Sequence, residues 1–161
     1  MPAGRPILVT GLHRSGTTWC GRLLSAGSEA YYVHEPFNRF HPPGICPARF
    51  DRWFQYVGAK NEDQYAPAID QTYSLRFSPG LHITSSLASS HPHWHDGVFG
   101  AVWSVREWAR WTRARLSGLR PLVKDPHALF AAEWIADRYD AQVVVLVRHP
   151  AGFVDSVQRA D

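Results

Sequence analysis

Short apolar runs alternate along the chain with longer stretches in which apolar residues recur at helical spacing. Runs rich in Val, Ile, Leu and Tyr predict four strands, at residues 7–10, 31–33, 122–124 and 142–147. Helical spacing predicts helices at residues 17–26, 49–57, 98–116 and 129–139, and a last helix that Pro150 opens. Residues 78–97 are rich in Ser, His, Pro and Gly, which predicts a loop.

Strands that alternate with helices predict an α/β fold with a parallel sheet and right-handed crossovers. The run at 142–147 continues after Gln142 as unbroken Val and Leu, which is typical of a strand covered on both faces. We expect Trp19, Leu23 and Leu24 to face inward from the first helix, and Phe153, Val154 and Val157 to continue the apolar face of the last. Ligands of such sheets bind beyond the carboxyl ends of the strands, so the residues there are the candidates for function.

Composition narrows the class of ligand. The 161 residues suit one domain, and 45% hydrophobic with 19% charged residues indicate a globular chain. The 17 Lys and Arg exceed the 14 Asp and Glu by only +3, which favours one anionic ligand over a nucleic-acid surface. No run approaches the roughly 20 apolar residues of a membrane span, and no signal peptide is recognisable. Cys20 and Cys46 lack metal or disulfide spacing, so we expect reduced thiols and a cytoplasmic location.

A candidate phosphate loop follows the first strand. Gly11 and Gly16 bound a segment between strand and helix, the layout in which backbone N–H groups and a helix N-terminus bind phosphate. Their spacing matches G-x-x-x-x-G-K-[ST], but Thr17 stands where nucleotide triphosphatases have lysine, and the cation is Arg14. The 142–147 strand leads into Arg148, a cation that suits phosphate or sulfate and cannot hold a metal.

A second anion site is predicted from Arg148 and Ser156. Ser156 lies about two turns into the helix that Pro150 opens, so the two residues can hold one phosphate from two sides. A strand-end arginine in a salt bridge, with a serine that faces solvent, is the alternative.

Three residues are candidates for proton transfer and charge stabilisation. Glu35 follows the second strand and can act as a general base, most effectively if burial raises its pKa. Lys124 ends the third strand and can stabilise developing negative charge, unless it pairs with Asp125 or Asp137. His127 is a rival base.

The segment Arg14-Ser15-Gly16-Thr17-Thr18-Trp19 resembles the 5′-phosphosulfate loop of sulfotransferases, usually K-S-G-T-T-W. These enzymes use 3′-phosphoadenosine 5′-phosphosulfate (PAPS), and arginine at the first position is similar to bacterial and carbohydrate-type members. Arg148 with Ser156 resembles the family's 3′-phosphate motif, and His34-Glu35-Pro36 looks like its strand-end glutamate base. Cytosolic members carry K-T-H where this chain has Lys124-Asp125-Pro126-His127, a mismatch that favours Glu35 over His127.

The resemblance implies a single P-loop-type domain over residues 1–161, a three-layer sandwich with a parallel sheet of about four strands in the order 2-3-1-4. It implies transfer of a sulfuryl group from PAPS to a hydroxyl of a carbohydrate, lipid or small molecule, without a metal. Residues 37–120 would form an acceptor-side insertion. The nucleotide would bind to His13, Arg14, Ser15, Gly16, Thr17, Thr18, Trp19, Arg148 and Ser156, and catalysis would rest on Glu35, Lys124 and Arg14. Trp19 would pack against the adenine, and is otherwise a helix core residue.

Three further expectations remain open. A P-loop kinase and a non-catalytic nucleotide-binding remnant are the alternative functions. The alternating histidines of His91–Asp96 do not have the spacing of a structural zinc site, which favours a solvated or acceptor-contacting loop. The sequence ends inside the last predicted helix, from which we expect a chain truncated at its C-terminus.

Overall fold

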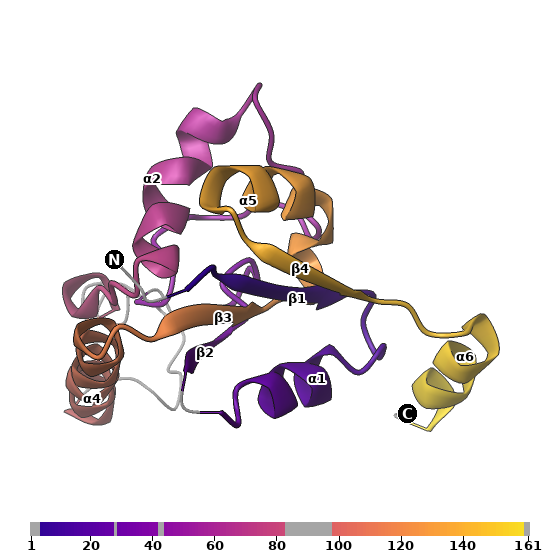
Figure 1. The fold of residues 1–161 in the computed structure, drawn as a ribbon, viewed down its shortest axis with the longest axis horizontal. Helices are drawn as coiled ribbons and strands as arrows, with labels where there is room; N and C mark the ends of the chain where they lie inside the picture. The colour runs from indigo at the N-terminus through magenta and orange to yellow at the C-terminus, as the bar shows by residue number, and fades with distance from the viewer. Residues whose placement is uncertain (1–3, 28, 42–43, 83–97, 160–161) are drawn as a thin grey trace.

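The computed structural model describes residues 4–27, 29–41, 44–82 and 98–159. One parallel sheet organises them, with the strand order β2-β3-β1-β4 (Figure 1). Its strands are β1 (Ile7–Gly11), β2 (Ala30–His34), β3 (Arg120–Lys124) and β4 (Gln142–Leu146). The predicted α/β fold, its parallel sheet and the strand order are therefore confirmed.

The two central strands form the inner core of the sheet. Ile7 of β1 lies opposite Leu122 of β3, and Leu8 lies opposite Val123. Side chains on successive strand residues point to opposite faces, so both faces of β1 and β3 require cover. Leu8, Val9, Leu122 and Val123 are fully buried, as unbroken apolar runs in parallel strands should be.

The fourth strand contradicts its predicted burial. Among the strands that the structure describes, β4 pairs with β1 alone and forms an edge of the sheet. Val145 is exposed, and Val147 just beyond the strand is 89% exposed. The Val and Leu run thus predicted a strand correctly but did not predict its burial. The position of a strand in the sheet decides how much of each face other elements cover.

Helices cover the two faces of the sheet (Figure 1). α1 (Thr17–Leu24) lies on one face, and α2 (Glu62–Tyr73) and α5 (Ala132–Tyr139) lie on the other. The small residues Thr17 and Gly21 are the ones that α1 buries. A Cβ on Gly21 would lie 3.1 Å from the Cβ of Lys124, so glycine permits α1 to approach β3 closely.

The expected inward face of α1 is wrong. Trp19 is 71% exposed, and Leu23 and Leu24 are exposed as well. Close packing through Thr17 and Gly21 turns the larger side chains away from the sheet, so Trp19 is not a core residue.

The segment between β2 and residue 82 differs most from the sequence prediction. Residues 49–57 form a bend, a turn and irregular chain in place of the predicted helix, and Phe54 adopts a left-handed φ of 55°. Phe50 and Val57 are nonetheless buried. The helix that does form here is α2, which contains Pro67, a residue that normally disfavours a helix interior.

Contacts with α5 stabilise α2. The carboxylate of Asp70 accepts two hydrogen bonds from Arg138, at 2.9 and 2.8 Å, and one from the Tyr139 hydroxyl at 2.8 Å. Trp134 Nε1 donates to Glu62 Oε2 at 2.7 Å. These tertiary bonds are invisible to periodicity, which explains why the sequence did not indicate the helix.

The remaining helices agree with prediction in position. α4 (Val98–Leu116) spans the predicted residues, and a 3-10 helix, η1 (Pro126–Ala131), leads into α5. α6 (Pro150–Gln158) buries none of its residues, so the expected apolar face of Phe153, Val154 and Val157 is exposed. Within the described ranges, no helix combines the length and the apolar character that a membrane span requires. Of the predicted loop, residues 79–82 form a helical turn and 83–97 lie outside the description.

Candidate functional site

The candidate phosphate loop joins β1 to α1 with an unusual backbone. Gly11 has φ 145° and Gly16 has φ 95°, and a Cβ on Gly11 would lie 2.3 Å from the carbonyl oxygen of Leu146. Between them Arg14 adopts φ 63°. Only glycine tolerates such a close approach to the β4 backbone at this φ. The loop path therefore depends on both glycines.

No side chain of the first turn of α1 occupies the N–H groups at the N-terminus of this helix. Gly16 is the N-cap residue, no side chain caps the helix, and the first turn holds no acidic residue. The first N–H groups of a helix lack intrahelical acceptors and favour negative charge. Ser15 Oγ donates instead to the carbonyl oxygen of Leu12 at 2.6 Å, which stabilises the turn of the loop.

Two arginines join this loop to the end of β4 and to α6. Arg148 Nη1 donates to the carbonyl oxygen of Arg14 at 2.8 Å. Arg14 Nη2 donates to the carbonyl oxygen of Ser156 at 2.8 Å. The structure thus brings Arg14, Arg148 and Ser156 together from segments more than 130 residues apart. Two arginines that bond to the backbone of each other's neighbourhood suit a ligand that carries more than one anionic group.

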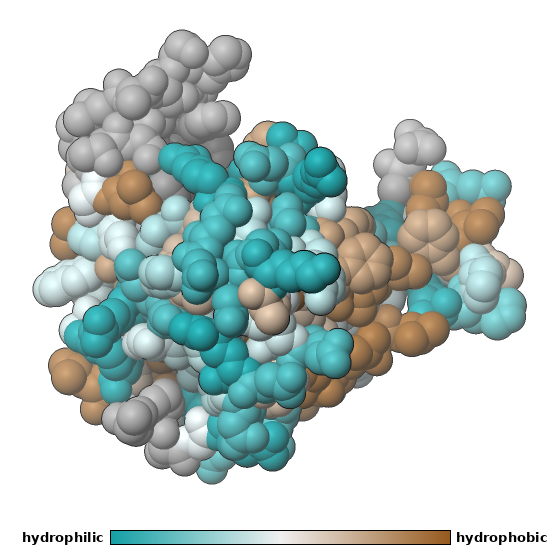
Figure 2. Space-filling view, turned by 90° about the horizontal axis from the view of Figure 1, so that it is seen from above, coloured by the Kyte–Doolittle hydropathy of each residue, from teal (hydrophilic) through white to brown (hydrophobic). Residues whose placement is uncertain are grey.

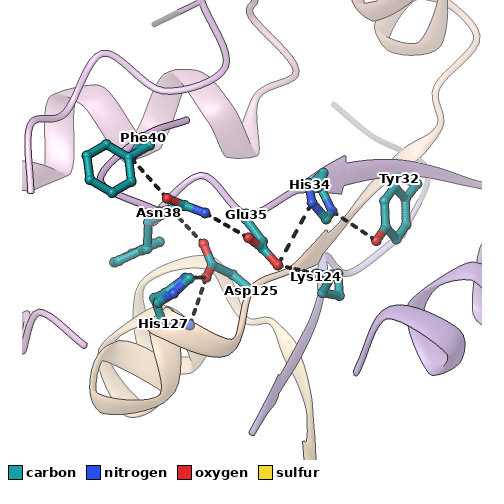
Figure 3. A network of polar contacts seen from close by, with 9 residues as sticks. Tyr32, His34, Glu35, Asn38, Phe40, Lys124, Asp125 and His127 are labelled. Carbon is teal, nitrogen blue, oxygen red and sulfur yellow. Dashed lines mark hydrogen bonds and ion pairs between the residues drawn. The ribbon is translucent and has the colours of Figure 1, made fainter. Parts of the chain in front are cut away.

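Glu35 and Lys124 form an ion pair at the same carboxyl-terminal edge of the sheet (Figure 3). The Lys124 side chain is 1% exposed and that of Glu35 is 18% exposed. Asn38 Nδ2 donates to Glu35 Oε2 at 2.9 Å, and the Glu35 N–H donates to the carbonyl oxygen of Lys124 at 2.8 Å. Lys124 therefore pairs with Glu35, and neither Asp125 nor Asp137 is its partner.

Two opposing effects set the pKa of the Glu35 carboxyl group. Burial alone would raise the pKa of this carboxyl group. Hydrogen bonds from Lys124 and Asn38, together with the charge of Lys124, outweigh burial, and the net pKa is lowered. The raised pKa that would make Glu35 a more effective base is therefore absent, because the buried ammonium group of Lys124 stabilises the carboxylate. Glu35 is consequently ionised at neutral pH.

His127, the rival base, lies in a separate buried network. Asp125 Oδ1 accepts a hydrogen bond from the His127 N–H at 2.9 Å and lies 3.2 Å from its Nδ1. The His127 ring packs against His13 of the loop and against Trp53, with ring centroids 4.7 and 4.6 Å apart. Burial, followed by the electrostatic effect of the neighbouring His127 ring, lowers the pKa of His13. His127 is thus a buried residue that contacts His13 of the candidate phosphate loop.

Sequence reasoning missed Asp125. This fully buried carboxylate caps η1 through the His127 N–H and also accepts a hydrogen bond from the Phe37 N–H. It therefore connects the end of β3 to the chain that follows Glu35. The available signal was Asp125-Pro126, an N-cap residue before a proline at the first helical position.

A cavity of about 390 Å³ opens beside Glu35. Aromatic rings from β2, the following loop and α4 form much of its wall, and Glu35 lies at the same wall; the rings are Tyr31, Tyr32, Phe40, Trp103 and Trp111. His127 is not part of the described lining. A mainly apolar pocket with a few polar groups is the usual form of a small-molecule site.

No metal-binding cluster of three His, Cys, Asp or Glu side chains occurs among the residues that the structure describes. The histidines at 91, 93 and 95 lie outside the described residues. Both cysteines are free thiols, and burial raises the pKa of Cys46 to about 11.

Comparison with known proteins gives one match. Residues 6–160 match the model of a family described as the sulfotransferase family. No curated protein and no solved structure matches the chain.

Proposed function

Because the chain belongs to the sulfotransferase family, we propose that it transfers the sulfuryl group of PAPS to a hydroxyl group of an acceptor that binds beside Glu35. The contacts that join Arg14, Arg148 and Ser156 carry this proposal. They set a second cationic group next to the phosphate loop, and PAPS differs from ATP in having a 3′-phosphate.

The loop suits the 5′ end of such a nucleotide. We assign that end to residues His13–Trp19, where the uncapped N-terminus of α1 and Arg14 supply N–H donors and positive charge. We assign the 3′-phosphate to Arg148 and Ser156. Trp19 is 71% exposed, so its ring is available to pack against the adenine.

PAPS, when bound, supplies an activated sulfuryl group. The side chains of the protein accept the proton of the acceptor hydroxyl and compensate the negative charge. Glu35 is ionised and borders the cavity, which suits removal of the proton from an acceptor hydroxyl. A proton on Glu35 would weaken its ion pair with Lys124. The ammonium group would then be free, together with Arg14, to compensate negative charge that develops in the reaction.

The acceptor side of the proposal rests on residues 37–120, since Phe40, Trp103 and Trp111 of this segment line the cavity together with β2. We also place the reaction in the cytoplasm, because Cys20 and Cys46 are free thiols, as is usual in reducing compartments.

Thermal unfolding with three nucleotides tests the donor assignment. We expect adenosine 3′,5′-bisphosphate without magnesium to raise the Tm by about 5 °C at saturation, and ATP or 5′-AMP to raise it much less. Arg148→Ala should abolish the difference between the bisphosphate and 5′-AMP. The matched control is Arg159→Ala at the C-cap of α6, since the guanidinium group of Arg159 pairs with Asp155.

The other outcomes point to the alternative functions. A larger shift with ATP and magnesium would favour a kinase. A shift with the bisphosphate but no transfer from PAPS to any acceptor would indicate a nucleotide-binding protein without activity.

A further inference from the structure

We propose that the acceptor carries an ammonium group, and that Glu107 of α4 recognises this group inside the cavity that Glu35 borders. This inference rests on the proposed function, since it specifies the chemical class of the acceptor. It makes Glu107 a specificity-determining residue, at a position that the sequence did not single out.

Glu107 lies between two tryptophans on one face of α4. Trp103, Glu107 and Trp111 are four residues apart in turn, a spacing that puts side chains on the same side of a helix, and all three line the cavity. Tyr31 of β2 packs edge-on against Trp111, with ring centroids 5.8 Å apart. Aromatic rings around a carboxylate are the groups that bind organic ammonium ions in proteins.

The charges of the described lining point the same way. It contains the two carboxylates of Glu35 and Glu107, and no lysine or arginine. Glu35 has Lys124 as a buried partner outside the lining, as shown above. The remaining titratable side chains of the lining are two histidines and two tyrosines. The pKa of one of these histidines, His34, is lowered by burial and then by the charge of Lys124. An anionic acceptor would therefore meet carboxylate oxygens in this cavity.

Glu107 has unused capacity to accept hydrogen bonds. Its side chain is 17% exposed, and Oε1 accepts from Arg110 Nη1 at 2.8 Å. Within the described residues no donor contacts the second oxygen, Oε2. Arg110 is 67% exposed, so water screens much of its charge. The charge of Glu107 still acts on Tyr31. Burial, followed by this negative charge, raises the pKa of Tyr31 to about 12.

Two series of matched acceptors test the proposal. The phenols tyramine, 4-ethylphenol and 4-hydroxyphenylacetate share a ring and a hydroxyl group and differ in charge, as do glucosamine, glucose and glucuronate. Binding is measured by NMR titration with adenosine 3′,5′-bisphosphate present, and transfer is measured as initial rates with PAPS. In at least one series we expect the cation to bind about tenfold more tightly than the anion, with the neutral compound between them.

Three variants connect this order to Glu107. Glu107→Gln should reduce the preference for the cation to less than about threefold, whereas Arg110→Gln should increase it, because it removes the positive partner of the same carboxylate. Glu133→Gln, the same change at an exposed position of α5, should leave the order unchanged. Loss of folding cannot produce opposite changes in the cation preference of the Glu107 and Arg110 variants. Circular dichroism monitors the folding of each variant.

The proposal is overturned by anions that bind as tightly as cations, by an unaltered order in Glu107→Gln, or by failure of all six compounds to bind. These results are distinct from failure of the proposed function. Absence of transfer from PAPS with the cation preference intact would remove sulfuryl transfer and retain the ammonium site.

Discussion

Glu35 and Lys124 illustrate how one side chain sets the chemistry of another. The Lys124 side chain is buried, with Gly21 of α1 packed over its Cβ and Cγ, a position that an isolated charge would not tolerate. Glu35 supplies the compensating charge from the left-handed turn after β2, where its φ is 46°. The same contact lowers the pKa of Glu35, so a carboxylate proposed as a base is also a structural partner.

Glu35→Gln separates these two roles. We expect transfer to fall by a factor of about 100 or more, because the amide cannot accept the acceptor's proton. The Tm shift with adenosine 3′,5′-bisphosphate should persist. The free energy of unfolding at pH 7 should fall by about 1–3 kcal/mol, because buried Lys124 loses its carboxylate. Unchanged turnover would exclude Glu35 as the base.

The stability difference between the parent and Glu35→Gln should also depend on pH. The folded-state pKa of Glu35 lies below its ordinary value of 4.5. The ion pair therefore stabilises the fold fully above that value, and its contribution is lost as the pH falls through the lowered pKa. Urea denaturation at several pH values between 7 and 3 measures this convergence; a constant difference would contradict it.

Individual elements are positioned by close approaches that involve backbone atoms. The loop after β1 passes so near β4 that Gly11 has no room for a side chain, and α1 approaches β3 at Gly21. These contacts bring the loop of one element to the end of another. The arrangement of Arg14 and Arg148 follows from them, because each guanidinium group bonds to a backbone carbonyl of the neighbouring segment.

Gly11→Ala tests this dependence. A Cβ at this position would lie 2.3 Å from a backbone oxygen, at a φ that L-residues rarely adopt. We expect a loss of about 2 kcal/mol or more in the free energy of unfolding, and a smaller Tm shift with adenosine 3′,5′-bisphosphate. Gly27→Ala is the matched control, since a Cβ there meets nothing within 4 Å and should change stability by less than about 0.5 kcal/mol. Equal stability of the two variants would contradict the prediction.

The molecule as a whole is unevenly packed. β1 and β3 lie in the centre of the sheet, whereas α6 buries no residue and projects from the end of β4 (Figure 1). Hydrophobic side chains lie on the surface between the main body and α6 (Figure 2). Among the described residues, the hydrogen bond from the Arg14 side chain to the Ser156 carbonyl oxygen joins α6 to the candidate phosphate loop.

Hydrogen exchange should report this difference. We expect amides of β1 and β3 to exchange slowest and those of α6 fastest, because exchange follows local opening. Adenosine 3′,5′-bisphosphate should slow exchange in α6 through its 3′-phosphate, and 5′-AMP should not. Mass spectrometry of peptic peptides measures both effects. Equal protection of α6 by the two nucleotides would contradict the assignment of Arg148 and Ser156.

The sequence by itself determined the strands, most helix positions and the motif residues, because backbone sterics and side-chain periodicity act over a few neighbouring residues. It predicted the extent of α4 correctly and misplaced a helix at 49–57, where Phe50 and Val57 are buried without a helix. Glu35, Lys124, Arg148 and the loop were identified from strand ends in the same local way.

Only the tertiary structure decided which of these residues meet. The pairing of Lys124 with Glu35, the exposure of β4 and the position of Glu107 in the cavity depend on strand order and on contacts between distant segments. Burial and charge partners arise from atoms brought together across the fold. Such contacts leave no local pattern in the chain, and they set both the pKa of the proposed base and the charge of the cavity beside it.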